Sequence, residues 1–145
     1  MYRHRDGVLE LLLAHPGGPF WAKKDIGAWS IPKGEYDDNE APLAAAQREF
    51  QEETGFAAAG PFIPLGELKQ ANGKLVTVWA CAGDCDPAAM TSNRFEMEWP
   101  PKSGKMQSFP EVDRVAWFDA GEAKQRVNLG QRGFVEALEQ HLDEA

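Results

Sequence analysis

Apolar and polar positions along the chain switch between strand-like and helix-like spacings. At the N-terminus, Asp6-Gly7 is typical of a two-residue turn, and the mostly apolar residues 8–13 that follow are typical of a strand, which together predict a hairpin. Only residues 1–5 precede the turn, so either the sheet edge is short or a few N-terminal residues are missing from the sequence. Further strands are predicted over residues 65–70, 75–81 and 112–118, with Asn72-Gly73 as the turn between the first two.

Helical patterns interleave with these strands. The first helix is predicted over residues 41–54, because Pro42 suits a first turn and Gly55 is a natural C-terminal cap. Capping-type side chains precede it at Asp37, Asp38 and Asn39. Two helical segments are predicted over residues 120–127 and 131–142, and in the second Phe134, Leu138 and Leu142 recur at four-residue spacing. Residues 29–31 are predicted to be extended, and residues 15–27 and 84–105 to be irregular.

Length and composition fit this alternation of helices and strands. The 145 residues predict one layered α/β domain over residues 1–145, and 43% hydrophobic residues are enough for a core. With no apolar run that could cross a bilayer and no leader-like start, we expect a soluble, cytoplasmic protein without a membrane partner. The net charge of −8 argues against nucleic acid as a general partner. An acidic protein can still bind an anionic substrate through a divalent cation.

The two cysteines, Cys81 and Cys85, have neither the spacing of a zinc-ribbon pair nor that of a C-x-x-C redox pair. Their neighbours are apolar, so we expect plain reduced thiols. The three histidines are too far apart in the sequence to suggest a set of metal ligands.

Three glutamates share one face of the predicted helix over residues 41–54. At 100° per residue, Glu49, Glu52 and Glu53 fall within roughly 100° of one another. A neighbouring apolar stripe would pack on the sheet, formed by Leu43, Ala46 and Phe50. Carboxylate oxygens at this spacing are the ligands that Mg²⁺ or Mn²⁺ uses. The alternative is an ordinary solvated helix face that Arg48 partly balances.

The segment before this helix favours the metal-site interpretation. It is rich in Gly and Pro and contains Lys33-Gly34. A glycine lets the backbone carbonyl approach an ion closely, and a lysine can bind a phosphate.

Residues 34–56 resemble the Nudix box. The match consists of Gly34, Glu40, Arg48-Glu49, Glu52-Glu53 and Gly55 at the spacing of that motif. The sequence departs from the pattern at Phe50 and Phe56, where the family usually has Ile, Leu or Val. Both positions remain apolar, so the packing can shift while the chemistry is retained.

The resemblance implies a Nudix-type α/β/α sandwich with a mixed β-sheet and the box as a loop–helix–loop. It also implies hydrolysis of a diphosphate linkage in a nucleoside diphosphate derivative with Mg²⁺ or Mn²⁺. Glu52 and Glu53 would bind the metal, together with the Gly34 carbonyl and Glu49, which could instead be the general base. Arg48 would hold the carboxylates by salt bridges, and Glu40 would support the loop or reach a metal through water. We leave the choice of general base open.

The substrate of this chemistry is less defined. Trp29 to Gly34 is similar to the W-x-x-P-K-G lead-in of enzymes that act on dinucleoside polyphosphates or diphosphoinositol polyphosphates, and Lys33 would bind their phosphates. The Tyr that this group often has beyond the box is missing, so a nucleoside triphosphate and a dinucleoside polyphosphate both remain open. Three late acids could add a ligand or a base, but a solvated surface position is the favoured interpretation for each: Glu96, Glu98 and Glu111. Trp99 and Phe109 could stack on a base or equally be loop anchors in the core.

Two other functions compete with hydrolysis. A nucleotide-sensing module would keep the fold without turnover, although such a module is expected to have a degraded box. A diphosphate isomerase would need Cys81 or Cys85 beside the metal. For assembly, a short first strand would leave a sheet edge that a second copy could cover in a homodimer.

Overall fold

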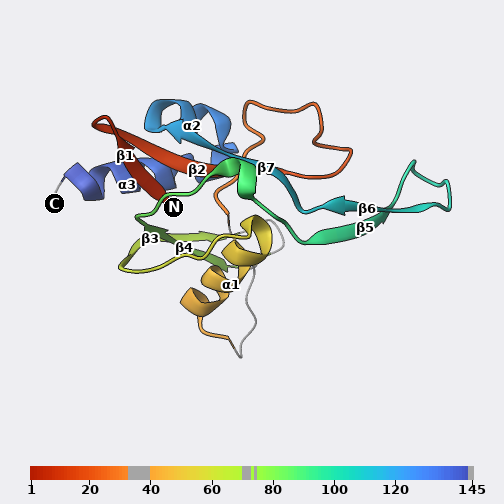
Figure 1. Cartoon of the computed structure of the whole chain (residues 1–145), viewed down its shortest axis with the longest axis horizontal. Helices are drawn as coiled ribbons and strands as arrows, with labels where there is room; N and C mark the ends of the chain where they lie inside the picture. The colour runs from red at the N-terminus through yellow and green to blue at the C-terminus, as the bar shows by residue number, and fades with distance from the viewer. Residues whose placement is uncertain (33–39, 70–72, 74, 144–145) are drawn as a thin grey trace.

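The structure is a computed structural model, and it describes residues 1–32, 40–69, 73 and 75–143 (Figure 1). The strands are β1 (Tyr2–Arg5), β2 (Val8–Pro16), β3 (Phe62–Lys69), β4 (Leu75–Cys81), β5 (Arg94–Glu98), β6 (Met106–Pro110) and β7 (Val112–Asp119). The α-helices are α1 (Pro42–Thr54), α2 (Ala120–Arg126) and α3 (Arg132–Asp143), and the short 3-10 turns are η1 (Pro87–Ala89) and η2 (Leu129–Gln131).

The central strand is β2, which pairs antiparallel with β1 on one side and β7 on the other. The predicted N-terminal hairpin is confirmed, and its turn has Asp6 and Gly7 at φ of 53° and 80°, as a type I′ turn requires. Because side chains alternate across a strand, β2 contributes to a core on each face of the sheet. Leu11 and Leu13 pack on the side of α2 and α3, and Leu12 packs on the side of Phe50 in α1.

The strands β3 and β4 form a second antiparallel hairpin, which packs against α1 (Figure 1). Val76 and Val78 pack against Phe134 of α3, and an isolated parallel bridge between Tyr2 and Ala82 links the end of β4 to β1. All ladders among the described residues are antiparallel, and parallel pairing occurs there only as isolated bridges. The helix α1 covers one face of the sheet formed by β1, β2 and β7, and α2 and α3 cover the other, which confirms the predicted α/β class.

The helix α1 carries the residues of the candidate site. Pro42 occupies its first turn and Gly55, at φ 80°, ends it by donating to the Gln51 carbonyl at 2.7 Å. The predicted boundaries are therefore confirmed to within a residue. The N-cap residue Ala41 makes no side-chain capping bond, and the predicted capping residues at 37–39 lie outside the described residues. Phe50 is buried and fixes the helix on the sheet, so the aromatic departure from the box pattern serves packing.

Two loop predictions are wrong in part. Residues 84–105 contain η1 and the strand β5, which pairs with β6 in a hairpin that projects from the rest of the molecule (Figure 1). The alternation of apolar and polar residues in β5 is short and lies between segments that contain Pro and Gly, so the sequence pattern did not predict this strand. The predicted loop from His15 starts too early, because β2 extends to Pro16 and His15 is fully buried. No helix in the described part of the chain has the length and apolar character that crossing a membrane requires.

Candidate active site

Arg48 connects three of the glutamates that the sequence analysis selected. Its guanidinium donates two hydrogen bonds of 2.8 Å to the Glu40 carboxylate. It also donates to Glu49 at 2.9 Å and to Glu52, one helical turn away, at 3.1 Å. The planar guanidinium thus ties the segment that enters α1 to two carboxylates on its surface, which is a geometry that a lysine cannot reproduce.

Charge and burial act differently on these carboxyl groups. The Arg48 guanidinium lowers the pKa of Glu40 through its hydrogen bonds. Burial raises the pKa of Glu49, and the negative charges of Glu52 and Glu111 raise it further, although Arg48 opposes both effects. Glu49 therefore binds a proton more readily than an exposed glutamate does in the metal-free protein.

A cleft of about 180 Å³ lies beside α1, between Glu53 and the start of β7. Glu111 also lines this cleft, and two hydrogen bonds fix its backbone. Its N–H donates to the Asn93 carbonyl at 2.7 Å, and its carbonyl accepts from the Gly17 N–H at 2.9 Å. The remaining lining residues are Ala14, Pro16, Ser30, Ile31, Pro32 and Val112.

The position of Glu111 differs from what its place in the sequence suggested. Glu111 is exposed, as a surface acid should be, yet it lines the same cleft as Glu53 and lies close enough to Glu49 to affect the pKa of Glu49. It stands 58 positions beyond Glu53 in the sequence, so no local spacing could connect them. Glu96 and Glu98 lie on β5 as exposed side chains, in agreement with the surface interpretation.

The chemistry of the donors fits a hard divalent cation. Glu53 and Glu111 line one cleft, and Glu49 lies within the field of Glu52 and Glu111. Carboxylate oxygens of this kind are preferred by Mg²⁺ and Mn²⁺. In the part of the chain that the structure describes, no three His, Cys, Asp or Glu side chains already converge as a ligand set, because Glu49 and Glu52 point to Arg48. Lys33 and Gly34, the other predicted contributors, lie outside the described residues.

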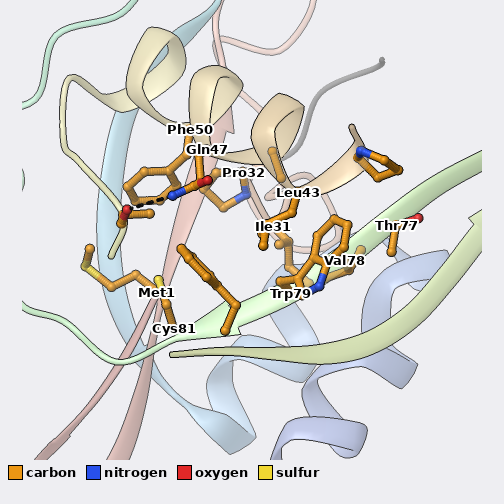
Figure 2. Close-up of a pocket in the computed structure, with 14 residues that line it drawn as sticks. Met1, Ile31, Pro32, Leu43, Gln47, Phe50, Thr77, Val78, Trp79 and Cys81 are labelled. Atoms are coloured by element: carbon orange, nitrogen blue, oxygen red, sulfur yellow. Dashed lines mark hydrogen bonds between the residues drawn. The ribbon is translucent and has the colours of Figure 1, made fainter. Parts of the chain in front are cut away.

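A second, apolar pocket lies between α1 and β4 (Figure 2). Leu43 and Phe50 reach it from the helix, and Thr77, Trp79 and Cys81 reach it from the strand. Its volume is about 50 Å³, whereas an engineered cavity that holds benzene measures about 150 Å³. A nucleobase is larger than benzene, so we interpret this pocket as a gap in the packing under α1 and place the chemistry at the carboxylate cleft.

Both cysteines lie among apolar side chains. They are free thiols, as predicted, and Cys81 is buried beside the apolar pocket. Cys85 packs with the cluster around Phe50, and burial raises the pKa of its thiol. A raised pKa disfavours the thiolate that nucleophilic or acid–base work by cysteine requires. These surroundings disfavour the isomerase alternative.

Comparisons with known proteins agree with this geometry. The family model described as NUDIX domain matches residues 3–138. A Nudix hydrolase 25 from Arabidopsis thaliana is 54% identical over 33 residues, which cover 23% of this chain and 19% of that protein. An RNA pyrophosphohydrolase from Erythrobacter litoralis is 40% identical over 62 residues, which cover 39% of this chain and 36% of that protein. The chain thus matches well under half of the length of these curated relatives.

Solved structures share the fold at low sequence identity. An Ap4A hydrolase from C. elegans, in a binary complex, aligns with a TM-score of 0.69 and 18% identity over 99% of this chain and 95% of that one. The NUDIX domain of Shewanella oneidensis NrtR, in complex with ADP ribose, aligns with a TM-score of 0.65 and 16% identity over 97% of this chain and 82% of that one.

Proposed function

Because the chain belongs to the Nudix hydrolase family, we propose that it hydrolyses a diphosphate linkage in a nucleoside diphosphate derivative with Mg²⁺ or Mn²⁺. The observation that carries the proposal is the cleft between Glu53 and Glu111, with Glu49 beside it and Arg48 fixing Glu49 and Glu52. An ordinary solvated helix face gives no reason for Glu53 to share a cleft with Glu111, a carboxylate that is distant in the sequence and lies between β6 and β7.

Each residue of the site has a stated role in this proposal. Glu52 and Glu53 are the metal ligands, with Glu49, Glu111 and the Gly34 carbonyl as further oxygen donors. A bound divalent cation neutralises diphosphate oxygens and lowers the pKa of a coordinated water. Arg48 is a positioning residue, since its hydrogen bonds orient Glu40, Glu49 and Glu52.

The general base is the least determined of these roles. Glu49 suits it because burial raises the pKa of its carboxyl group, and a base with a higher pKa accepts a proton from water more readily. Outside the box, Glu111 is the other carboxylate at the cleft, so a comparison of their glutamine variants separates the two.

The substrate class is a nucleoside triphosphate or a dinucleoside polyphosphate. The solved structures with the same fold include an Ap4A hydrolase and a domain bound to ADP ribose, and both Ap4A and ADP ribose are nucleotides. Lys33 would contact the phosphate chain, as the resemblance of its loop implies.

We place the protein in the cytoplasm, with a small nucleotide as its partner. Its net charge of −8 disfavours nucleic acid. In the described structure β1 ends the three-stranded ladder, with an isolated bridge from Tyr2 to Ala82, and a second copy that pairs with the rest of β1 would form a homodimer. Sedimentation at micromolar concentration tests this assembly directly.

The experiment is a turnover screen with nucleoside triphosphates and dinucleoside polyphosphates in Mg²⁺, Mn²⁺ or excess EDTA. We expect turnover with metal and none in EDTA. Glu52→Gln and Glu53→Gln should each lose at least about a hundredfold in kcat, whereas Glu136→Gln, an exposed glutamate of α3, should behave as wild type. Binding of nucleotides without any turnover would contradict the proposal and support a sensing module instead.

A further inference from the structure

Exposed aromatic rings gather where the loop after β2 meets the β5–β6 hairpin. Phe20 and Trp21 keep 58% and 40% of their surface exposed. The Phe20 ring meets Trp99, which follows β5, edge to face at 5.2 Å between centroids. Large exposed rings cost solvation free energy and are otherwise uncommon on a soluble domain, so their gathering at one place indicates a binding surface.

Lysines accompany these rings. The Lys24 ammonium lies 5.0 Å from the centre of the Trp21 ring. The carbonyl of Lys105 accepts a hydrogen bond of 3.0 Å from the Trp99 N–H, so this lysine lies beside the second tryptophan. Residues 16–24 and 99–110 contain no Asp or Glu in a chain whose net charge is −8. We call the group Phe20, Trp21, Lys24, Trp99 and Lys105 the aromatic–lysine surface.

A short stretch of backbone joins this surface to the carboxylate cleft. The loop that carries Phe20 and Trp21 begins directly after Pro16, which lines the cleft. The Gly17 N–H donates to the carbonyl of Glu111, and a Cβ on Gly17 would lie 1.8 Å from the Pro110 carbonyl oxygen. Only glycine permits this approach, which fixes the loop against the start of β7.

We propose that the aromatic–lysine surface binds the second nucleoside of a dinucleoside polyphosphate, so that this class of molecule is the substrate. The inference rests on the proposed function for its cleft and adds a separate base site. The carboxylate cleft holds the diphosphate to be cut, a base stacks on Trp21 or Phe20, and Lys24 and Lys105 neutralise the outer phosphates. Flat aromatic rings bind any nucleobase by stacking, and ammonium groups complement phosphate.

Charge and size favour a small dinucleotide over a long polynucleotide. The lysines are confined to two short segments, and a chain of net charge −8 repels a polyanion that extends past them. The two exposed rings offer stacking area for one or two bases rather than for a strand.

The test compares the binding of diadenosine tetraphosphate and adenosine tetraphosphate by calorimetry in EDTA, where no turnover occurs. We expect wild type to bind the dinucleotide at least about fivefold more tightly, which is the low end of what one base stacked on an aromatic ring contributes. Trp21→Ala and Phe20→Ala should reduce this preference, and Trp21→Phe should retain most of it. Ile26→Ala is the matched control, since it removes an equally exposed apolar side chain from the same loop.

Three outcomes would overturn the proposal: equal binding of both ligands by wild type, a preference that survives both alanine variants, or a single-stranded RNA oligonucleotide that binds more tightly than the dinucleotide through the same residues. Thermal melting of each variant verifies that it is folded. A preference for the dinucleotide in a protein that turns over nothing would reject the proposed hydrolysis and leave this base site standing.

Discussion

His15 joins three parts of the chain from a fully buried position on β2. Its Nδ1 lies 2.8 Å from a carboxylate oxygen of Asp113 on β7, and its Nε2 lies 2.7 Å from the carbonyl of Lys24. Each ring nitrogen of His15 thus has an oxygen partner within hydrogen-bond distance, one a carboxylate and the other a backbone carbonyl. Through Lys24 this residue also fixes the loop that carries Trp21.

Replacing His15 by Leu keeps an apolar side chain of similar size and removes both hydrogen bonds. A hydrogen bond to a charged group contributes about 1.5–3 kcal/mol. The Asp113 side chain is 31% exposed, so solvent screening favours the lower end of that range. The bond to the Lys24 carbonyl adds about 0.5–1.5 kcal/mol. We therefore expect His15→Leu to reduce the free energy of unfolding by about 2–3 kcal/mol.

Urea unfolding followed by tryptophan fluorescence measures this loss. An unchanged slope of the unfolding free energy against urea concentration verifies that the substitution has not altered the unfolded state. His15→Gln is the matched control, because its amide can still donate to one of the two acceptors and should lose less. A loss below about 1 kcal/mol for His15→Leu would refute the reasoning, since the two bonds would then contribute no more than one ordinary hydrogen bond.

Two other predictions concern α1. Ala46→Met places a larger apolar side chain in the apolar pocket and should raise the free energy of unfolding in urea by about 1 kcal/mol, since each buried methylene contributes about 0.8 kcal/mol. The exposed control Ala44→Met should change this free energy by no more than about 0.5 kcal/mol. Equal effects of the two substitutions would contradict the pocket assignment. The raised pKa of Glu49 means that its carboxylate costs stability once the pH rises through that pKa. Glu49→Gln should thus raise the Tm of the metal-free protein at pH 7, and in acid its Tm should no longer exceed that of wild type. A Tm below that of wild type at pH 7 would contradict this prediction.

Local features of the sequence predicted much of the fold. The turn at Asp6-Gly7 and the end of α1 at Gly55 follow from backbone conformations that few other residues adopt, so the residues themselves identify them. The glutamate face of α1 follows from helical spacing alone. The buried spacing of Phe134 and Leu138 in α3 was likewise visible as a period.

The parts of the fold and of the candidate site that the sequence did not predict depend on contacts between residues that are distant in the sequence. Glu111 joins the cleft only because β7 pairs with β2 and because Gly17 binds its carbonyl, and neither contact leaves a pattern in the sequence. The edge-to-face pair of Phe20 and Trp99 spans two segments that both resemble ordinary loops. The short β5–β6 hairpin was missed because Pro and Gly on either side of it dominate the pattern. A candidate site assembled from one helix was therefore predictable, whereas the walls of its cleft were not.

Metal binding by the carboxylates of α1 is the central claim, and Mn²⁺ binding measured by electron paramagnetic resonance tests it without any assumption about substrate. We expect wild type and Glu136→Gln to bind Mn²⁺ alike, and Glu52→Gln and Glu53→Gln to bind it at least about tenfold more weakly, as the loss of a charged ligand implies. Binding of equal strength in all four proteins would contradict the claim and return the three glutamates to a solvated helix face.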